Sequence, residues 1–88
     1  MYILECEGII YGSGETPLAA LEDAQEYVEI DDTRVTIIEH PRQHYPTGAI
    51  AIWPATEQLV AASRRDSHGL CWEWNHQANA ADVIGEEG

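Results

Sequence analysis

Short apolar runs alternate with glycine-rich breaks at the start of the chain. Tyr2–Cys6 and Ile9–Tyr11 are rich in isoleucine and tyrosine, and Glu7-Gly8 separates them. Two such runs joined by an acidic residue and a glycine predict a β-hairpin. Gly12-Ser13-Gly14 then interrupts the apolar pattern, and we interpret it as a turn, since it is too short for a phosphate-binding loop.

Helical spacing follows this break. Thr16 is a good N-cap, and Pro17 suits the first helical position, where its missing N–H costs nothing. We therefore predict a helix from about Pro17 to Glu29. Its inward stripe is predicted to consist of Leu18, Leu21, Ala24, Tyr27 and Val28.

The rest of the chain repeats the strand and helix patterns. β-Branched or apolar runs predict strands at Arg34–Glu39, Ala49–Trp53 and Leu70–Asn75, with Asp31-Asp32 as a turn and His40–Gly48 as a loop. Thr56 predicts the cap of a second helix that runs to about Asp66, with Leu59, Val60, Ala62 and Ser63 facing inward. The order ββα-ββα-β predicts an α+β fold, a two-layer sandwich in which both helices cover one face of an antiparallel sheet.

The length of 88 residues is that of one domain. We place this domain at residues 1–77 and interpret residues 78–88 as a partly flexible C-terminal tail. As an alternative, Ala78–Ile84 forms one or two helical turns.

No apolar run approaches the roughly 20 residues of a membrane span, and the N-terminus lacks the features of a secretory signal. With two cysteines and no disulfide framework, we expect a cytoplasmic protein with reduced thiols.

The charge balance is strongly acidic. The chain has 16 acidic residues against 4 arginines, no lysine, and a formal net charge of -12. Binding to phosphate groups needs basic residues in number, so we exclude direct partnership with nucleic acid or with an anionic membrane. The remaining explanations are solubility through self-repulsion, adaptation to high salt, and a basic protein partner.

The residues from Glu15 to Asp32, called here the acidic segment, contain no basic residue. Glu22 and Glu26 are four positions apart, where like charges on a helix repel, and Glu29 is at the unfavourable end of the helix dipole. Carboxylates spaced along a helix can offer a basic nucleic-acid channel a substitute for phosphates. We therefore predict that a partner binds Glu22, Asp23, Glu26, Glu29, Asp31 and Asp32. The competing interface is the strand carrying Trp72 and Trp74, which alternate along the chain and so share one face of a sheet. The alternative role of these tryptophans is to fill the core in place of phenylalanine, which the chain lacks.

Metal binding is the main chemical alternative. His40, His44, His68 and Cys71 have the ligand types of a tetrahedral zinc site, so a small metal-binding or redox protein is one hypothesis. Their spacing lacks the close cysteine pairs that identify zinc knuckles, and we predict no bound metal and no cofactor. The serines, histidines and carboxylates show no nucleophile motif, so we do not predict an enzyme.

Gly14-Glu15-Thr16 followed by Ala20-Leu21 resembles a segment of HicB-type antitoxins, in which a strand ends in Gly-Asp/Glu-Thr before a helix. The resemblance covers residues 1–30 and implies an antitoxin that neutralises a basic RNase toxin. In length, charge and absence of catalytic motifs the chain also resembles small phage-encoded inhibitors, notably anti-CRISPR proteins. That likeness implies a non-enzymatic inhibitor acting in the host cytoplasm on the basic surface of a nucleic-acid-handling protein.

Overall fold

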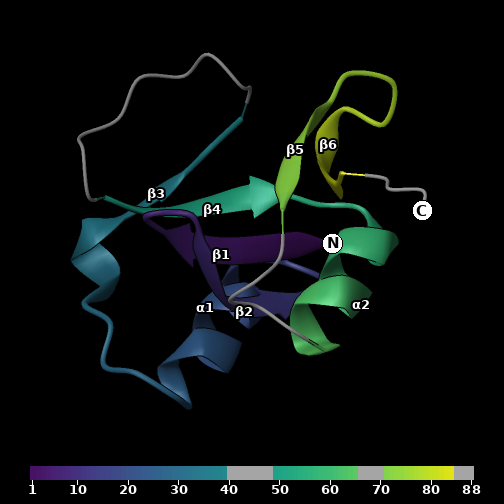
Figure 1. Ribbon diagram of the computed structural model, residues 1–88. Coiled ribbons are helices and arrows are strands. Elements are labelled where there is room, and N and C mark those ends of the chain that lie inside the picture. The colour runs from purple at the N-terminus through teal and green to yellow at the C-terminus, as the bar shows by residue number, and fades with distance from the viewer. Residues whose placement is uncertain (40–48, 66–70, 85–88) are drawn as a thin grey trace.

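The structure is a computed structural model that describes residues 1–39, 49–65 and 71–84. These residues form a four-stranded sheet, a two-stranded sheet and two α-helices (Figure 1). In chain order the elements are β1 (Tyr2–Cys6), β2 (Ile9–Gly14), α1 (Pro17–Gln25), the 3₁₀-helix η1 (Asp32–Arg34), β3 (Val35–Ile37), β4 (Ile50–Pro54), α2 (Glu57–Arg65), β5 (Trp72–Asn75) and β6 (Ala80–Val83). The predicted α+β class is confirmed.

The predicted hairpin of β1 and β2 is present. Cys6 pairs with Ile9, and the two residues between them, Glu7 and Gly8, have φ angles of 55° and 88°. Two successive positive φ angles are those of a type I′ turn, whose twist matches that of the strands. The Glu5 carboxylate stabilises the turn, since its Oε2 accepts a hydrogen bond of 2.9 Å from the Gly8 N–H.

The larger sheet has the strand order β2-β1-β4-β3. β1 is antiparallel to both β2 and β4, but β3 runs parallel to β4, with Val35 opposite Ile50. The prediction of a wholly antiparallel sheet is therefore wrong. Parallel neighbours need a long connection, and the residues between Ile37 and Ile50 provide one.

The two helices cover opposite faces of this sheet, not one face as predicted. Successive residues of a strand point to opposite sides, and Ile3 and Leu4 of β1 belong to two separate cores. Ile3 packs in the core that contains Leu59 and Val60 of α2, whereas Leu4 packs with Ala20 and Ala24 of α1. The molecule thus has α1 on one side of the sheet, and α2 with the β5–β6 hairpin on the other.

Gly12 and Gly14 explain how close α1 lies to the sheet. Both belong to β2, so the turn predicted there is absent. A Cβ atom on Gly12 would lie 2.6 Å from the Ala20 carbonyl oxygen, and one on Gly14 would lie 2.6 Å from the Ala19 Cβ. Glycine on the strand and alanine on the helix therefore allow a backbone contact that larger residues would prevent.

The last two strands correct the predicted C-terminal tail. Residues 80–83 form β6, which pairs antiparallel with β5, whereas the prediction assigned them to a flexible or helical segment. Trp72 and Trp74 of β5 pack against Trp53 of β4, with ring centroids 5.7 Å and 6.3 Å apart. This aromatic contact attaches the hairpin to the sheet and explains why a sequence as weakly β-forming as Ala80–Val83 adopts a strand.

Candidate functional site

The acidic segment includes α1, which is shorter than predicted. The helix ends at Gln25, with Glu26 as its C-cap, and no basic residue occupies its last turn. Carboxylates near this end oppose the helix dipole, which is a physical reason for the early stop. The Thr16 cap is present, since its hydroxyl accepts a hydrogen bond of 3.0 Å from the Ala19 N–H.

The inward stripe predicted for this helix is only partly correct. Ala24 is fully buried, as predicted, but Leu18 is 62% exposed and Tyr27 is 73% exposed. Leu21 is half-buried, and Val28 is exposed. The close contact of α1 with β2 admits only small residues, so the buried positions are alanines rather than the larger apolar residues.

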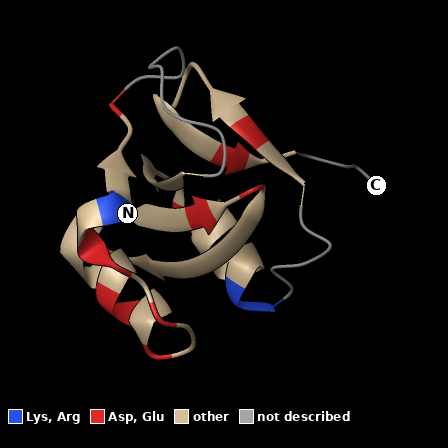
Figure 2. Ribbon diagram, turned by 90° about the vertical axis from the view of Figure 1, so that its left-hand side faces the viewer, with Lys and Arg blue, Asp and Glu red and all other residues tan. Residues whose placement is uncertain are grey.

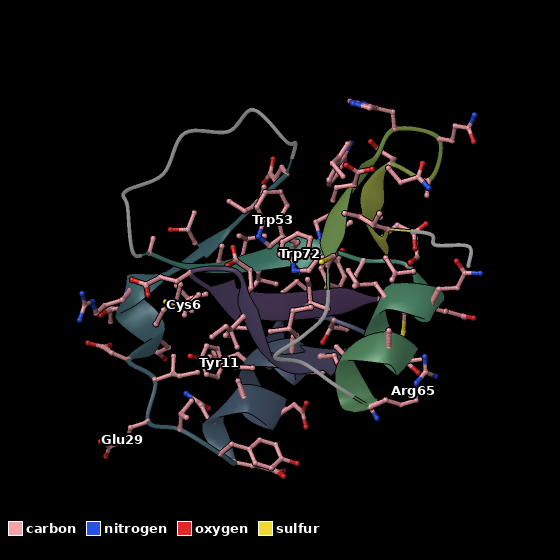
Figure 3. All side chains as sticks on the ribbon, viewed as in Figure 1. Cys6, Tyr11, Glu29, Trp53, Arg65 and Trp72 are labelled. Atoms are coloured by element: carbon pink, nitrogen blue, oxygen red, sulfur yellow. The ribbon has the colours of Figure 1, made fainter. Side chains whose placement is uncertain are left out.

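Five of the six predicted partner-binding residues are exposed: Glu22, Glu26, Glu29, Asp31 and Asp32. They run from the outer face of α1 into η1, where the red of the acidic residues gathers in Figure 2. Glu29 is labelled in Figure 3, where it lies at the periphery of the molecule. The structure thus places these carboxylates at exposed positions from α1 to η1, with half-buried Asp23, buried Ala24 and half-buried Ile30 between them.

Asp23, the sixth residue, has a different role. Its side chain is half-buried, and its Oδ2 accepts a hydrogen bond of 3.0 Å from the Ser13 N–H of β2. Because β2 is at the edge of the sheet, this bond satisfies a backbone donor that no strand pairs with among the described residues. Asp23 therefore joins α1 to the sheet edge, and the exposed acidic surface consists of the other five residues.

Asp31 organises the far end of the acidic segment. Its Oδ1 accepts hydrogen bonds from the Thr33 hydroxyl, at 2.7 Å, and from the Thr33 N–H, at 3.0 Å. These bonds hold the pKa of Asp31 below its ordinary value of 3.8, and the positive charge of Arg34 adds to the effect. The lowered pKa favours the ionised form of Asp31.

A groove borders the acidic segment, and sequence reasoning missed it. It has a volume of about 590 Å³ and follows the outer edge of β2 from Ile9 to Ser13. One wall consists of Asp23, Tyr27 and Val28 at the end of α1, and the other consists of Ser63 and Arg64 of α2. We call this feature the β2-edge groove. The sequence carries no signal for it, because the end of α1 at Gln25, beyond which Tyr27 and Val28 are exposed, is seen only in the structure.

The two walls of the groove carry opposite charge. On the α2 side, the Arg64 Nε donates a hydrogen bond of 3.1 Å to the Ser13 hydroxyl. Arg64 and Arg65 form the basic last turn of α2, seen as the blue end of that helix in Figure 2. On the α1 side, Asp23 is the carboxylate among the lining residues of the groove.

The competing tryptophan surface is largely internal. Trp53 is buried, and Trp72 and Trp74 are half-buried against it. Figure 3 shows the labelled Trp53 and Trp72 side by side. The Trp53 indole N–H donates a hydrogen bond of 3.0 Å to Oε1 of Glu5, which is itself only 6% exposed. These tryptophans therefore attach the β5–β6 hairpin to the larger sheet. Because their rings are buried or half-buried, little aromatic surface is left for a partner to contact.

The metal hypothesis concerns residues that are mostly outside the described ranges, namely His40, His44 and His68. Cys71, the fourth predicted ligand, is exposed. Within residues 1–39, 49–65 and 71–84, no group of three or more potential ligands is arranged to hold a metal ion. Burial, followed by the charges of Glu7 and Glu5, raises the pKa of the other thiol, Cys6, which disfavours a reactive thiolate there.

Comparison of the chain with protein-family models, with curated proteins and with solved structures finds no match in any of the three. Neither helix in the described part of the chain combines the length and apolar character needed to cross a membrane. The function must therefore be inferred from the acidic segment, the β2-edge groove and their charges.

Proposed function

We propose that this chain is a non-enzymatic binding protein that inhibits a nucleic-acid-handling protein by occupying its basic surface, with anti-CRISPR activity as the specific form. The observation that carries the proposal is the exposure of Glu22, Glu26, Glu29, Asp31 and Asp32 along one stretch of chain. No lysine or arginine interrupts this stretch, and the whole chain has a net charge of -12. Such a surface matches a channel that evolved to bind phosphates.

Electrostatics gives the mechanism of the proposed inhibition. Opposite charge steers the inhibitor toward the basic channel and raises the association rate, an effect that falls as salt increases. Once bound, the carboxylates accept hydrogen bonds from arginine and lysine side chains that would otherwise contact nucleic-acid phosphates. Nucleic acid is then excluded by direct competition, so the inhibitor needs no catalytic group.

The second candidate is a HicB-like antitoxin, and one local feature favours it. β2 ends at Gly14 and Thr16 caps α1, which is the strand-to-helix junction that the resemblance of residues 1–30 implies. An antitoxin would use the same acidic segment to neutralise a basic RNase toxin. The two functions differ in the partner alone, so the assay must include both kinds of target.

Charge reversal tests the proposal. Purified CRISPR effector complexes and basic RNase toxins are assayed for DNA binding or RNA cleavage, with and without the chain. We expect Glu22→Arg/Glu26→Arg to weaken inhibition by about ten- to a hundredfold, since each lost charge pair costs on the order of 1 kcal/mol or more. The matched control Glu57→Arg/Glu73→Arg changes the net charge equally at two exposed acids outside the acidic segment.

The outcome separates three cases. Inhibition of an effector complex that is lost only in the Glu22/Glu26 variant supports the proposal, and the same pattern with an RNase supports the antitoxin alternative. Equal losses in both variants would show that net charge, and not this surface, is responsible. Undiminished inhibition by a Glu22/Glu26 variant that folds normally by circular dichroism would contradict the acidic segment as the contact surface.

A further inference from the structure

The β2-edge groove contains one acid and one base, and the same residue holds both. Ser13 of β2 is only 3% exposed. Its N–H donates a hydrogen bond of 3.0 Å to Oδ2 of Asp23, and its hydroxyl accepts one of 3.1 Å from Nε of Arg64. A buried serine therefore positions a carboxylate and a guanidinium in one groove, which is how a binding site is preorganised.

Both charged groups keep hydrogen-bonding capacity for a ligand. A guanidinium has five N–H donors, and the described residues take up one of them from Arg64, its Nε–H. A carboxylate accepts through two oxygens, and among the described residues only Oδ2 of Asp23 receives a hydrogen bond. The groove therefore offers donors of positive charge and an acceptor of negative charge at the same time.

The spacing of the two charges limits the ligand that can bridge them. The N and Oγ atoms of one serine lie about 3 Å apart, so the hydrogen bonds of 3.0 Å and 3.1 Å keep Arg64 Nε within about 9 Å of Asp23 Oδ2. After a hydrogen bond of about 2.9 Å at each end, a few ångströms remain between the two charged groups of the ligand. An α-amino acid fits this short span, because its ammonium and its carboxylate are attached to one carbon.

We propose that the β2-edge groove binds a free α-amino acid with a large apolar or aromatic side chain. The ammonium group donates to Asp23, and the carboxylate accepts from Arg64. This orientation suits the helix ends, because α1 has no basic residue in its last turn, whereas α2 has Arg64 and Arg65 there. A zwitterion carries no net charge, so the net charge of -12 on the chain does not repel it.

Apolar surface in the groove receives the side chain of the ligand. Tyr27 and Val28 line the groove and are 73% and 38% exposed. A tyrosine ring gains from contact with a second aromatic ring beyond the area that the contact buries. The volume of about 590 Å³ is within the range of small-molecule sites and leaves room for a large side chain.

The β1–β2 register gives a second sign of a binding site, a β-bulge at Tyr11. Consecutive residues of β1 pair with Gly12 and Ile10, so Tyr11 between them is the extra residue of β2. Tyr11 lines the groove and is half-buried. β-Bulges are frequent next to active sites, where they redirect a side chain. The bulge thus interrupts regular pairing at the place where the groove needs a side chain.

This site is separate from the acidic surface described above. The lining residues of the groove include none of its five exposed acids, Glu22, Glu26, Glu29, Asp31 and Asp32. The inference therefore goes beyond the proposed function, and either can fail while the other holds.

L-Phenylalanine and three of its analogues test the charge pair. Phenethylamine lacks the carboxylate, hydrocinnamate lacks the ammonium, and glycine lacks the aromatic side chain. Each compound is titrated into the full chain, and binding is followed by amide chemical shifts. We expect L-phenylalanine to shift the amides of Ile9–Ser13 and Tyr27 and to bind at least about tenfold more tightly than each analogue.

Two pairs of matched variants locate the contact. Arg64→Gln and Arg65→Gln each remove one positive charge from the last turn of α2, but only Arg64 lines the groove. Asp23→Asn and Glu22→Gln each remove one negative charge from α1, but only Asp23 lines the groove. We expect Arg64→Gln and Asp23→Asn to weaken the binding of L-phenylalanine about tenfold, and the two controls to weaken it less than about twofold.

Three results would overturn the inference. The first is the absence of shifts along Ile9–Ser13 at millimolar L-phenylalanine. The second is equal or tighter binding of phenethylamine or hydrocinnamate, which would show that a single charge and not a zwitterion is recognised. The third is an equal effect of a variant and its matched control, with folding intact by circular dichroism. The analogue series uses the natural chain, so it decides the question even if Asp23→Asn does not fold.

Discussion

Asp82 connects the β5–β6 hairpin to α2, and replacing it with asparagine should loosen that connection. Its Oδ1 accepts a hydrogen bond of 2.6 Å from the Thr56 hydroxyl, and its Oδ2 accepts one of 3.0 Å from the Asn75 amide. The Thr56 hydroxyl also accepts a hydrogen bond of 3.2 Å from the Leu59 N–H and so caps α2. Asp82→Asn keeps the shape of the side chain but removes its charge and turns an NH₂ group toward the NH₂ of Asn75.

The magnitude follows from the two bonds between elements. A hydrogen bond to a charged group contributes about 1.5–3 kcal/mol, and partial exposure of Asp82 reduces this through solvent screening. We expect Asp82→Asn to lower the free energy of unfolding by about 1–2 kcal/mol. In a domain of this size, each 1 kcal/mol corresponds to a fall in Tm of about 4–8 °C.

The pH dependence gives a sharper test. The hydrogen bonds from Thr56, then from Asn75, hold the pKa of Asp82 below its ordinary value of 3.8. The stabilisation by the ionised carboxylate is therefore complete above pH 3.8 and is lost as the pH falls through the lowered pKa of the folded state. The difference in Tm between the natural chain and Asp82→Asn should be constant near neutral pH and should shrink below pH 3.8.

Thermal unfolding followed by circular dichroism measures both effects, and Glu73→Gln is the matched control. Glu73 lies directly across from Asp82 in the register of the hairpin, so this variant removes the same charge from the same place. It should not destabilise the fold, because it removes a like-charged neighbour of Asp82. An unchanged Tm for Asp82→Asn, or a deficit that persists undiminished in acid, would refute the assigned role.

Three further measurements test the packing and the charge. Gly12→Val should destabilise the fold by at least about 1–3 kcal/mol in urea titrations, because its Cβ would collide with the Ala20 and Ala24 backbone. Trp53→Phe should cost about 1–3 kcal/mol in the same titration, since it removes the indole donor to buried Glu5. The Tm of the natural chain should rise from low salt to about 0.1 M salt, because screening within a Debye length of ~10 Å relieves repulsion in the acidic segment; a salt-independent Tm would contradict that repulsion.

Local features of the fold could be predicted from the sequence because neighbouring residues determine them. The Glu7-Gly8 turn and the helix starts at Thr16 and Thr56 follow from backbone preferences and capping, and α2 buries the four residues predicted for it. The parallel pairing of β3 with β4 depends on contacts between distant residues, which no local pattern encodes. β6 was missed because its sequence is weakly β-forming and is stabilised by tryptophans elsewhere in the chain.

The part of the candidate site that could be predicted from the sequence is its set of charged residues. The exposed carboxylates of the acidic segment were found because five of them have no structural role that would bury them. The bond of Asp23 to the Ser13 N–H could not be foreseen, since it depends on how α1 packs beside the edge strand. The β2-edge groove was missed for the same reason: Gly12 was interpreted as part of a turn, although it brings α1 against β2 and so sets one wall of the groove.

The position of β1 has a consequence for the order in which the molecule folds. Its pairing with β2 joins residues close in sequence, and the core shared with α1 needs mainly the N-terminal third of the chain. On its other side, Tyr2 pairs with Pro54, and the face bearing Trp53 is covered only when Trp72 and Trp74 have been added. Contacts between distant residues close loops slowly. We therefore expect the face with Trp53 to become covered late in folding, so that the change in tryptophan fluorescence follows the formation of the β1–β2 hairpin.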